Sequence, residues 1–210
     1  MLDGAVGVFC AVGGVEPQTE TVWAQANTYA VPRIAFINKM DRLGADFYSV
    51  LEQMKTKLNE HPVPLFIPIG SENSFEGIIS LLDMKALYFS QEDKGSTIEM
   101  RPIPESLQAK AEEWRGKLID ECATYSDEIM ELYFAGEDIP KDMILSTLRK
   151  CTIERSLLPV FTGSSLKNIG VQTLLDGIVD LLPSPAQAHP VKGYWEKKDK
   201  EIEVIHDEKG

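Results

Sequence analysis

The stretch Arg33-Ile-Ala-Phe-Ile-Asn-Lys-Met-Asp41 decides the fold class of this chain. Arg33 to Ile37 form a mostly apolar run, as expected for a strand that is buried on both faces of a parallel sheet. Polar residues, Asn38 and Asp41 among them, follow at the carboxyl end of that strand, where open α/β sheets bind their ligands. The stretch therefore predicts an α/β fold with a ligand site at a strand end.

The segments around this strand alternate in the same way. Gly4 to Val12 is another continuous apolar run, and we expect a strand that is buried on both faces. A helix is predicted from about Pro17, because proline suits the first helical turn. A second helix, with one apolar face, is predicted for about Asp46 to Asn59.

The alternation resumes near the C-terminal end. Leu157 to Thr162 is predicted to be a strand, and Pro159 within it favours an edge strand because proline cannot donate to a ladder. The strongly amphipathic segment Val171 to Leu182 predicts the last helix. Together these parts predict one side of a doubly wound parallel sheet.

Between them the pattern changes to short strands followed by helices, which indicates a separate α+β unit. Strands are expected at Leu65 to Ile69, Gly77 to Leu82, Ala86 to Phe89 and Thr97 to Met100, and helices at about Glu105 to Ala123, Asp127 to Phe134 (with Ser126 as N-cap) and Pro140 to Thr152. We therefore divide the chain into a parallel-sheet part (1–62 and 157–185), an inserted α+β subdomain (63–156, "the insert"), and a linker with the start of a further domain (186–210).

Composition limits the function classes. The 210 residues, 43% hydrophobic and 26% charged, suit one domain with a small insert. No apolar run reaches the roughly 18 residues that span a membrane, and we expect a cytoplasmic protein. The three cysteines and three histidines are scattered, so we predict no metal site and no catalytic residue. The net charge of −12 argues against strong direct binding of nucleic acid and favours a basic protein partner.

Two predicted strand ends carry the candidate site, Asn38-Lys-Met-Asp41 and Gly163-Ser-Ser-Leu166. The Asp41 carboxylate can accept two parallel hydrogen bonds, which matches the adjacent ring N–H and amine of guanine and not adenine. Lys39 can lie along the base face, Asn38 can tie neighbouring loops together, and the backbone N–H of Ser164 or Ser165 can meet the guanine carbonyl oxygen. An alternative is a polar loop in which Asp41 only supports the next turn. The candidate guanine-binding residues are Asn38, Lys39, Met40, Asp41, Gly163, Ser164, Ser165 and Leu166.

These segments resemble the translational GTPase family of elongation factor G. Ile34 to Phe47 is similar to its fourth guanine motif, and Gly163 to Gln172 to its fifth, with Ser165 in place of the usual alanine. Leu2 to Val6, together with Gly13 to Trp23, resembles the segment after its switch II, and Leu181 to Pro185 resembles its exit into a second domain. The resemblance covers nearly the whole chain, and it identifies the insert with the family's G′ subdomain.

The resemblance implies a factor that binds GTP or GDP and drives movement of tRNA and mRNA on the ribosome. The chain contains no Gly-x-x-x-x-Gly-Lys-Ser/Thr phosphate loop, and Asp41-Arg-Leu-Gly44 only mimics the family's Asp-x-x-Gly pattern. The family's phosphate- and Mg²⁺-binding parts lie upstream of residue 1, so we expect no GTPase activity for this chain and base binding of about millimolar affinity at best. We also expect that Met1 is not the start of the natural protein.

The resemblance also implies partners. The insert faces the ribosomal stalk protein in the family, which suggests a docking role for the acidic residues of its first two helices; a solvated face is the alternative. The residues concerned are Glu112, Glu113, Asp120 and Glu121, with Asp127, Glu128 and Glu131 nearby. Without the upstream strand, Gly4 to Val12 becomes an exposed sheet edge, and we expect self-association there.

Two other functions stay open. The chain could be a docking module without a nucleotide role, although such a module has no reason to keep both strand-end motifs. It could also belong to a related translational GTPase, of the release factor 3 type or a ribosome-protection protein. Arg42, Gly44 and Ala45 favour the elongation factor G type.

Overall fold

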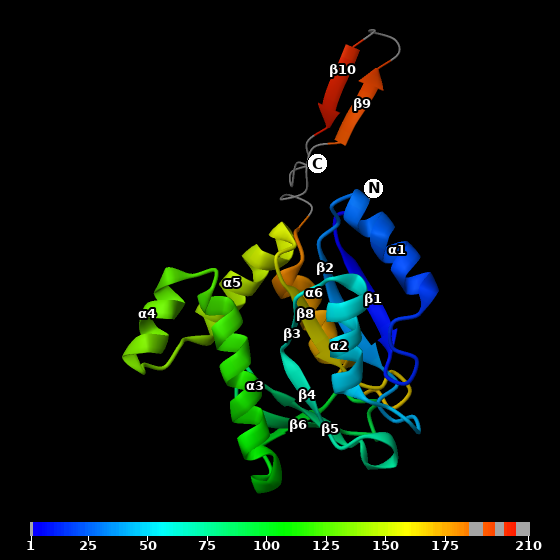
Figure 1. Ribbon diagram of the computed structural model, residues 1–210. Helices are drawn as coiled ribbons and strands as arrows, with labels where there is room; N and C mark the ends of the chain where they lie inside the picture. The colour runs from blue at the N-terminus through cyan, green and yellow to red at the C-terminus, as the bar shows by residue number, and fades with distance from the viewer. Residues whose placement is uncertain (1, 185–190, 196–199, 205–210) are drawn as a thin grey trace.

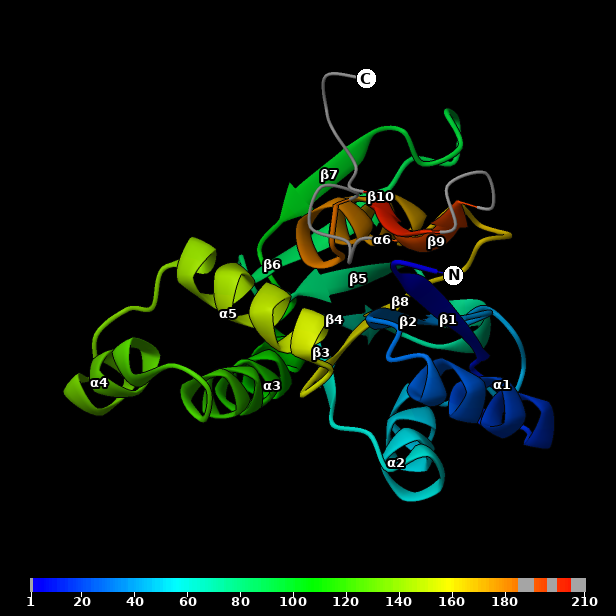
Figure 2. The same ribbon diagram turned by 90° about the horizontal axis from the view of Figure 1, so that it is seen from above.

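The computed structural model describes residues 2–184, 191–195 and 200–204 (Figure 1). Its parallel sheet has the order β1-β2-β8-β3, formed by β1 (Ala5–Cys10), β2 (Arg33–Asn38), β8 (Leu158–Thr162) and β3 (Pro62–Pro64). Figure 2 shows α1 (Pro17–Thr28) and α2 (Phe47–Leu58) on one face of this sheet and α6 (Val171–Leu181) on the other. The predicted α/β class with helices on both faces is confirmed.

The interior of the sheet corrects one prediction. β8 is not an edge strand: it pairs in parallel with β2 on one side and with β3 on the other. Its registered pairing with β2 begins at Ala35↔Val160, so Pro159 precedes that ladder and its missing N–H removes none of those bonds. The strand β3, which has proline at two of three positions, was not predicted because proline argues against a strand.

The burial of β1, the outer strand, differs from a second prediction. β1 was expected to be buried on both faces, but it is the end strand of the sheet and its Val8 side chain is 61% exposed. Ala5 N–H donates to Pro32 C=O and Ala11 N–H to Asn38 C=O, so alternate residues face β2. The backbone groups of Val6 and Val8 therefore point away from the sheet. This is the exposed edge that the family resemblance implied.

The insert forms a second, antiparallel sheet of order β4-β5-β6-β7, followed by helices, as expected. The Ser126 hydroxyl accepts from Ile129 N–H, so Ser126 is the predicted N-cap of the middle helix. The elements are β4 (Phe66–Ile69), the 3₁₀ turn η1 (Glu72–Ser74), β5 (Gly77–Ser80), β6 (Lys85–Phe89), β7 (Ile98–Arg101), α3 (Glu105–Ala123), α4 (Asp127–Ala135) and α5 (Lys141–Glu154).

The two sheets share one hydrophobic core. Leu65 N–H donates to Val160 C=O as the chain leaves β3 for β4, and the rings of Phe66 and Phe161 lie 5.6 Å apart. The parallel sheet includes β3, whose last two residues, Val63 and Pro64, are the first two of the range assigned to the insert. The insert is therefore fused to the sheet by packing as well as by its connections.

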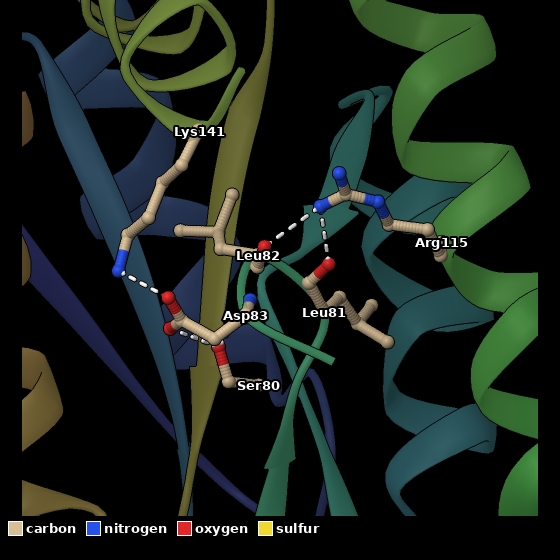
Figure 3. A network of polar contacts seen from close by, with 6 residues as sticks. All are labelled: Ser80, Leu81, Leu82, Asp83, Arg115 and Lys141. Carbon is tan, nitrogen blue, oxygen red and sulfur yellow. Dashed lines mark hydrogen bonds and ion pairs between the residues drawn. The ribbon is translucent and has the colours of Figure 1, made fainter. Parts of the chain in front are cut away.

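A polar network ties the turn after β5 to two helices of the insert (Figure 3). Lys141 Nζ lies 2.7 Å from Asp83 Oδ1, and Ser80 Oγ donates to Asp83 Oδ2. Arg115 donates to the carbonyl oxygens of Leu81 and Leu82. Burial would raise the pKa of the Asp83 carboxyl, but the hydrogen bonds from Lys141 and Ser80 and the Lys141 charge hold it below its ordinary value.

The remaining described segments, β9 (Val191–Trp195) and β10 (Lys200–Val204), pair antiparallel. The rest of the predicted linker and further domain beyond Ser184 lies outside the described residues. In the part of the chain that the structure describes, no helix has both the length and the apolar character needed to cross a membrane. The same residues contain no group of His, Cys, Asp and Glu side chains that could hold a metal ion.

Candidate functional site

The two predicted strand ends meet at one edge of the parallel sheet. Ile37 of β2 lies in register with Thr162 of β8, so the loops that begin at Asn38 and Gly163 leave the sheet side by side. Gly163 N–H donates to Ile37 C=O at 3.0 Å, and Met40 N–H donates to Gly163 C=O at 3.2 Å. We call residues 38–45 the first loop and residues 163–170 the second loop.

Asn38 joins the two loops. Its side-chain Oδ1 accepts from Lys39 N–H at 2.7 Å and from Ser165 N–H at 3.0 Å. This is the tie between neighbouring loops that the sequence suggested for Asn38. The same oxygen thus fixes the start of the first loop and the middle of the second.

Asp41 is oriented by the second loop. The fully buried Ser164 hydroxyl donates to Asp41 Oδ1 at 2.5 Å and accepts from Lys167 N–H at 3.2 Å. A carboxylate has about four acceptor positions on its two oxygens. Among the described residues nothing donates to Asp41 Oδ2, so the carboxylate is fixed in place and keeps acceptor capacity for a ligand.

The backbone donors differ from the prediction. Ser164 N–H donates to Ile169 C=O at 2.9 Å, and Ser165 N–H is taken by Asn38, so neither is free for a guanine carbonyl oxygen. Among the described residues, no hydrogen-bond acceptor pairs with the Leu166 N–H, and Leu166 is 84% exposed. The sequence could not show which backbone N–H stays free. That depends on which N–H groups are hydrogen-bonded when the loop folds.

Of the other predicted residues, Met40 and Gly163 maintain the structure of the loops, and Lys39 is available to contact a ligand. Met40 is 1% exposed and belongs to the core, so it anchors the first loop. A Cβ on Gly163 would lie 2.1 Å from Ile169 C=O, which explains the need for glycine there. Lys39 is exposed and has a positive φ of 68°, so its side chain is free to lie over a ligand.

One further residue lies at this edge of the sheet. It is Cys10, at the end of β1, which the sequence analysis did not single out. Burial would raise the pKa of its thiol, but the backbone N–H groups of Gly13 and Val12 and the charges of Lys39 and Arg42 hold that pKa below its ordinary value.

The acidic residues of the insert lie on α3 and α4. In both Figure 1 and Figure 2, α4 lies on the opposite side of the molecule from α1. Glu113 pairs with Lys117, and Glu112 accepts from Gln108. All seven predicted acidic side chains are exposed: Glu112, Glu113, Asp120, Glu121, Asp127, Glu128 and Glu131.

Comparison with known proteins shows the family to which this chain belongs. The family model described as elongation factor Tu GTP binding domain matches residues 1–184. A protein of known crystal structure from Thermus thermophilus has the same fold, with a TM-score of 0.78 over 91% of this chain at 23% sequence identity. This chain spans 29% of the length of that one.

Proposed function

Because the chain belongs to the elongation factor Tu GTP binding domain family, we propose that it carries the guanine-reading part of a translational GTPase of the elongation factor G type. The family binds guanine nucleotide. The observation that carries the proposal is the Asp41 carboxylate, which Ser164 orients through Oδ1, while Oδ2 and the second acceptor position of Oδ1 stay available to the two adjacent donors of guanine.

The remaining contacts would come from the same two loops. The Leu166 N–H would meet the guanine carbonyl oxygen, and the Lys39 side chain would cover one face of the base. The described residues offer no phosphate loop, so GTP or GDP would be held by its base alone, and Mg²⁺ would come with parts that this sequence does not contain. We expect a dissociation constant of about millimolar for the chain by itself.

For the longer protein we propose GTP-dependent movement of tRNA and mRNA on the ribosome, in the cytoplasm. A related GTPase of the release factor 3 or ribosome-protection type is the nearest alternative. A docking module without a nucleotide role is the alternative of a different class. The paired loops with an oriented Asp41 favour the GTPases.

We further propose that the insert contacts the ribosomal stalk protein through its acidic helices. Glu112, Asp120 and Glu121 are exposed and would attract a basic partner, mainly raising the association rate. The test is a titration with the stalk domain after reversal of Glu112, Glu113 and Glu121 to Lys. An unchanged affinity and association rate would reject this part of the proposal.

The base-reading proposal is tested by amide-resolved NMR with GDP, and with ADP as the control nucleotide. We expect shifts specific to GDP at residues 38–41 and 164–166. Asp41→Asn should weaken GDP binding at least tenfold, by about 1.4 kcal/mol, because its amide would place a donor against the guanine amine. It should favour xanthosine diphosphate instead, whose base has a carbonyl at that place.

The exposed Asp3→Asn removes the same charge far from the loops and should bind GDP like the unchanged chain. Equal shifts with GDP and ADP, or no shifts in the two loops, would favour the docking module.

A further inference from the structure

The first loop is held from outside by the insert. Glu72, in the 3₁₀ turn η1, donates its N–H to Met40 C=O at 2.8 Å and accepts from Gly44 N–H with its side-chain Oε1 at 2.7 Å. These two bonds flank Asp41 on both sides along the chain. The parallel sheet thus sets where the loop starts, and Glu72 holds the part that contains Asp41.

The second loop is held by the same subdomain. Gln91, just after β6, donates to Lys167 C=O at 3.0 Å, and Lys167 Nζ donates to Phe75 C=O at 3.2 Å. Gln172 donates to Gly95 C=O at 2.7 Å. A Cβ on Gly95 would lie 2.3 Å from Asn168 C=O, so the turn between β6 and β7 packs directly against this loop.

The conformation of Glu72 is itself unfavourable. Its φ of 56° is in the left-handed region, which L-residues seldom adopt. The capping box formed by Ser71 and Ser74 fixes the turn in this conformation, so Glu72 is presented to the first loop already in place. A preformed acceptor holds a loop with less loss of freedom than a flexible one.

We propose that the insert is a brace for guanine recognition, with Glu72 and Gln91 as its positioning residues. The brace sets the separation between the Asp41 carboxylate and the Leu166 N–H, which must both reach one planar base. Selectivity for guanine over adenine therefore depends on residues that never touch the nucleotide. This inference rests on the proposed base-reading function and adds the origin of its geometry.

The experiment compares GDP and ADP shifts in Glu72→Ala, Gln91→Ala and Glu72→Gln. Glu72→Ala leaves Gly44 N–H without its acceptor and should weaken GDP binding about three- to tenfold. Gln91→Ala should act in the same direction on the second loop. Glu72→Gln keeps an oxygen at the same place and should stay within about twofold of the unchanged chain.

Two controls separate positioning from general stability. Glu76→Ala changes an exposed neighbour whose side chain makes no hydrogen bond among the described residues, and it should bind GDP normally. Urea unfolding should show similar midpoints for Glu76→Ala and Glu72→Ala. Glu76 is exposed, Glu72 is half-buried, and the exposed Gly44 N–H that loses its acceptor can bond to water. ADP shifts should stay equally small in all variants.

The outcomes are distinct. If the unchanged chain shows no GDP-specific shifts, the base-reading function fails and the brace fails with it. If the unchanged chain binds GDP and Glu72→Ala and Gln91→Ala bind it as well as Glu76→Ala does, the brace alone is overturned. Selective loss of GDP binding with rescue by Glu72→Gln supports it.

Discussion

Strands β1 and β2 lie side by side and are both largely apolar, yet they are buried to very different degrees. Ile34 and Ile37 of β2 are fully buried, whereas Val8 of β1 is mostly exposed. β2 has β8 on its other side and contacts α5 and α6, while no described strand covers the outer side of β1. The apolar sequence of a strand therefore indicates only that the strand can be buried. The strands and helices that pack beside it decide how far its side chains are buried.

The helix beside each strand repeats the contrast. α2 buries one complete apolar face, including Phe47 and Met54. α1 buries only Trp23 fully, and its Val22 and Tyr29 line an open apolar groove of about 560 Å³ with Leu2 and Val31. The free edge of the sheet thus continues into a surface that suits a protein contact.

The largest effect should come from the contact that links the two regions. Glu60 Oε1 accepts from Trp23 Nε1 of α1 at 2.7 Å and from Arg33 Nη2 of β2 at 2.6 Å, and Arg33 is 5% exposed beneath the Trp23 ring. Glu60→Ala leaves a buried guanidinium without its counter-charge and should lower the free energy of unfolding by about 3–5 kcal/mol.

Urea unfolding measures this loss. The exposed Glu52→Ala on α2 is the matched control and should change the free energy of unfolding by less than about 0.5 kcal/mol. A similar small change for Glu60→Ala would mean that α1 and β2 are held together without a contribution from Glu60.

A smaller effect should appear at the free edge. If β1 pairs with another copy of the chain, Val8→Lys should weaken self-association at least tenfold, about 1.4 kcal/mol, because charged edge strands resist pairing. Sedimentation equilibrium at several concentrations measures this, with Glu52→Ala again as the control. An unchanged chain that stays monomeric at high concentration would show that the edge does not pair with itself.

The smallest effect should be a pH dependence of stability from the ion pair between Asp83 and Lys141 in the insert. The pKa of Asp83 is lower in the folded chain than its ordinary value, so its ion pair with Lys141 stabilises the fold above about pH 4, and that contribution is lost as the pH falls through the folded pKa. Both side chains are partly exposed, so the contribution at neutral pH should be below about 1 kcal/mol.

Lys141→Met removes the pair. The difference in unfolding free energy between Lys141→Met and the unchanged chain should shrink from pH 7 to pH 3. A difference that is constant over this range would show that the ion pair does not contribute.

The sequence predicted what depends on local pattern. The apolar runs, the helix limits around Asp46 and Asn59 and the Ser126 cap all follow from periodicity and capping chemistry, and the structure has them. Pro159 misled because the bonds of β8 toward β3 involve its neighbours Leu158 and Val160, and its missing N–H precedes the registered pairs with β2. The loop residues 38–41 and 163–166 were identified from the sequence. The hydrogen bond from Ser165 N–H to the Asn38 side chain was not, because it depends on tertiary contact between the two loops.

The Asn38 to Ser165 hydrogen bond has a consequence for how the chain is made. It joins residues that are 127 positions apart, with all of the insert between them. During synthesis, Asn38 emerges long before its partner exists, so the first loop must wait without its tie while the insert is made. Non-local contacts of this length also slow folding, because the loop between them must close first. We expect the two loops to join late, after the insert has folded and β8 has docked on β2.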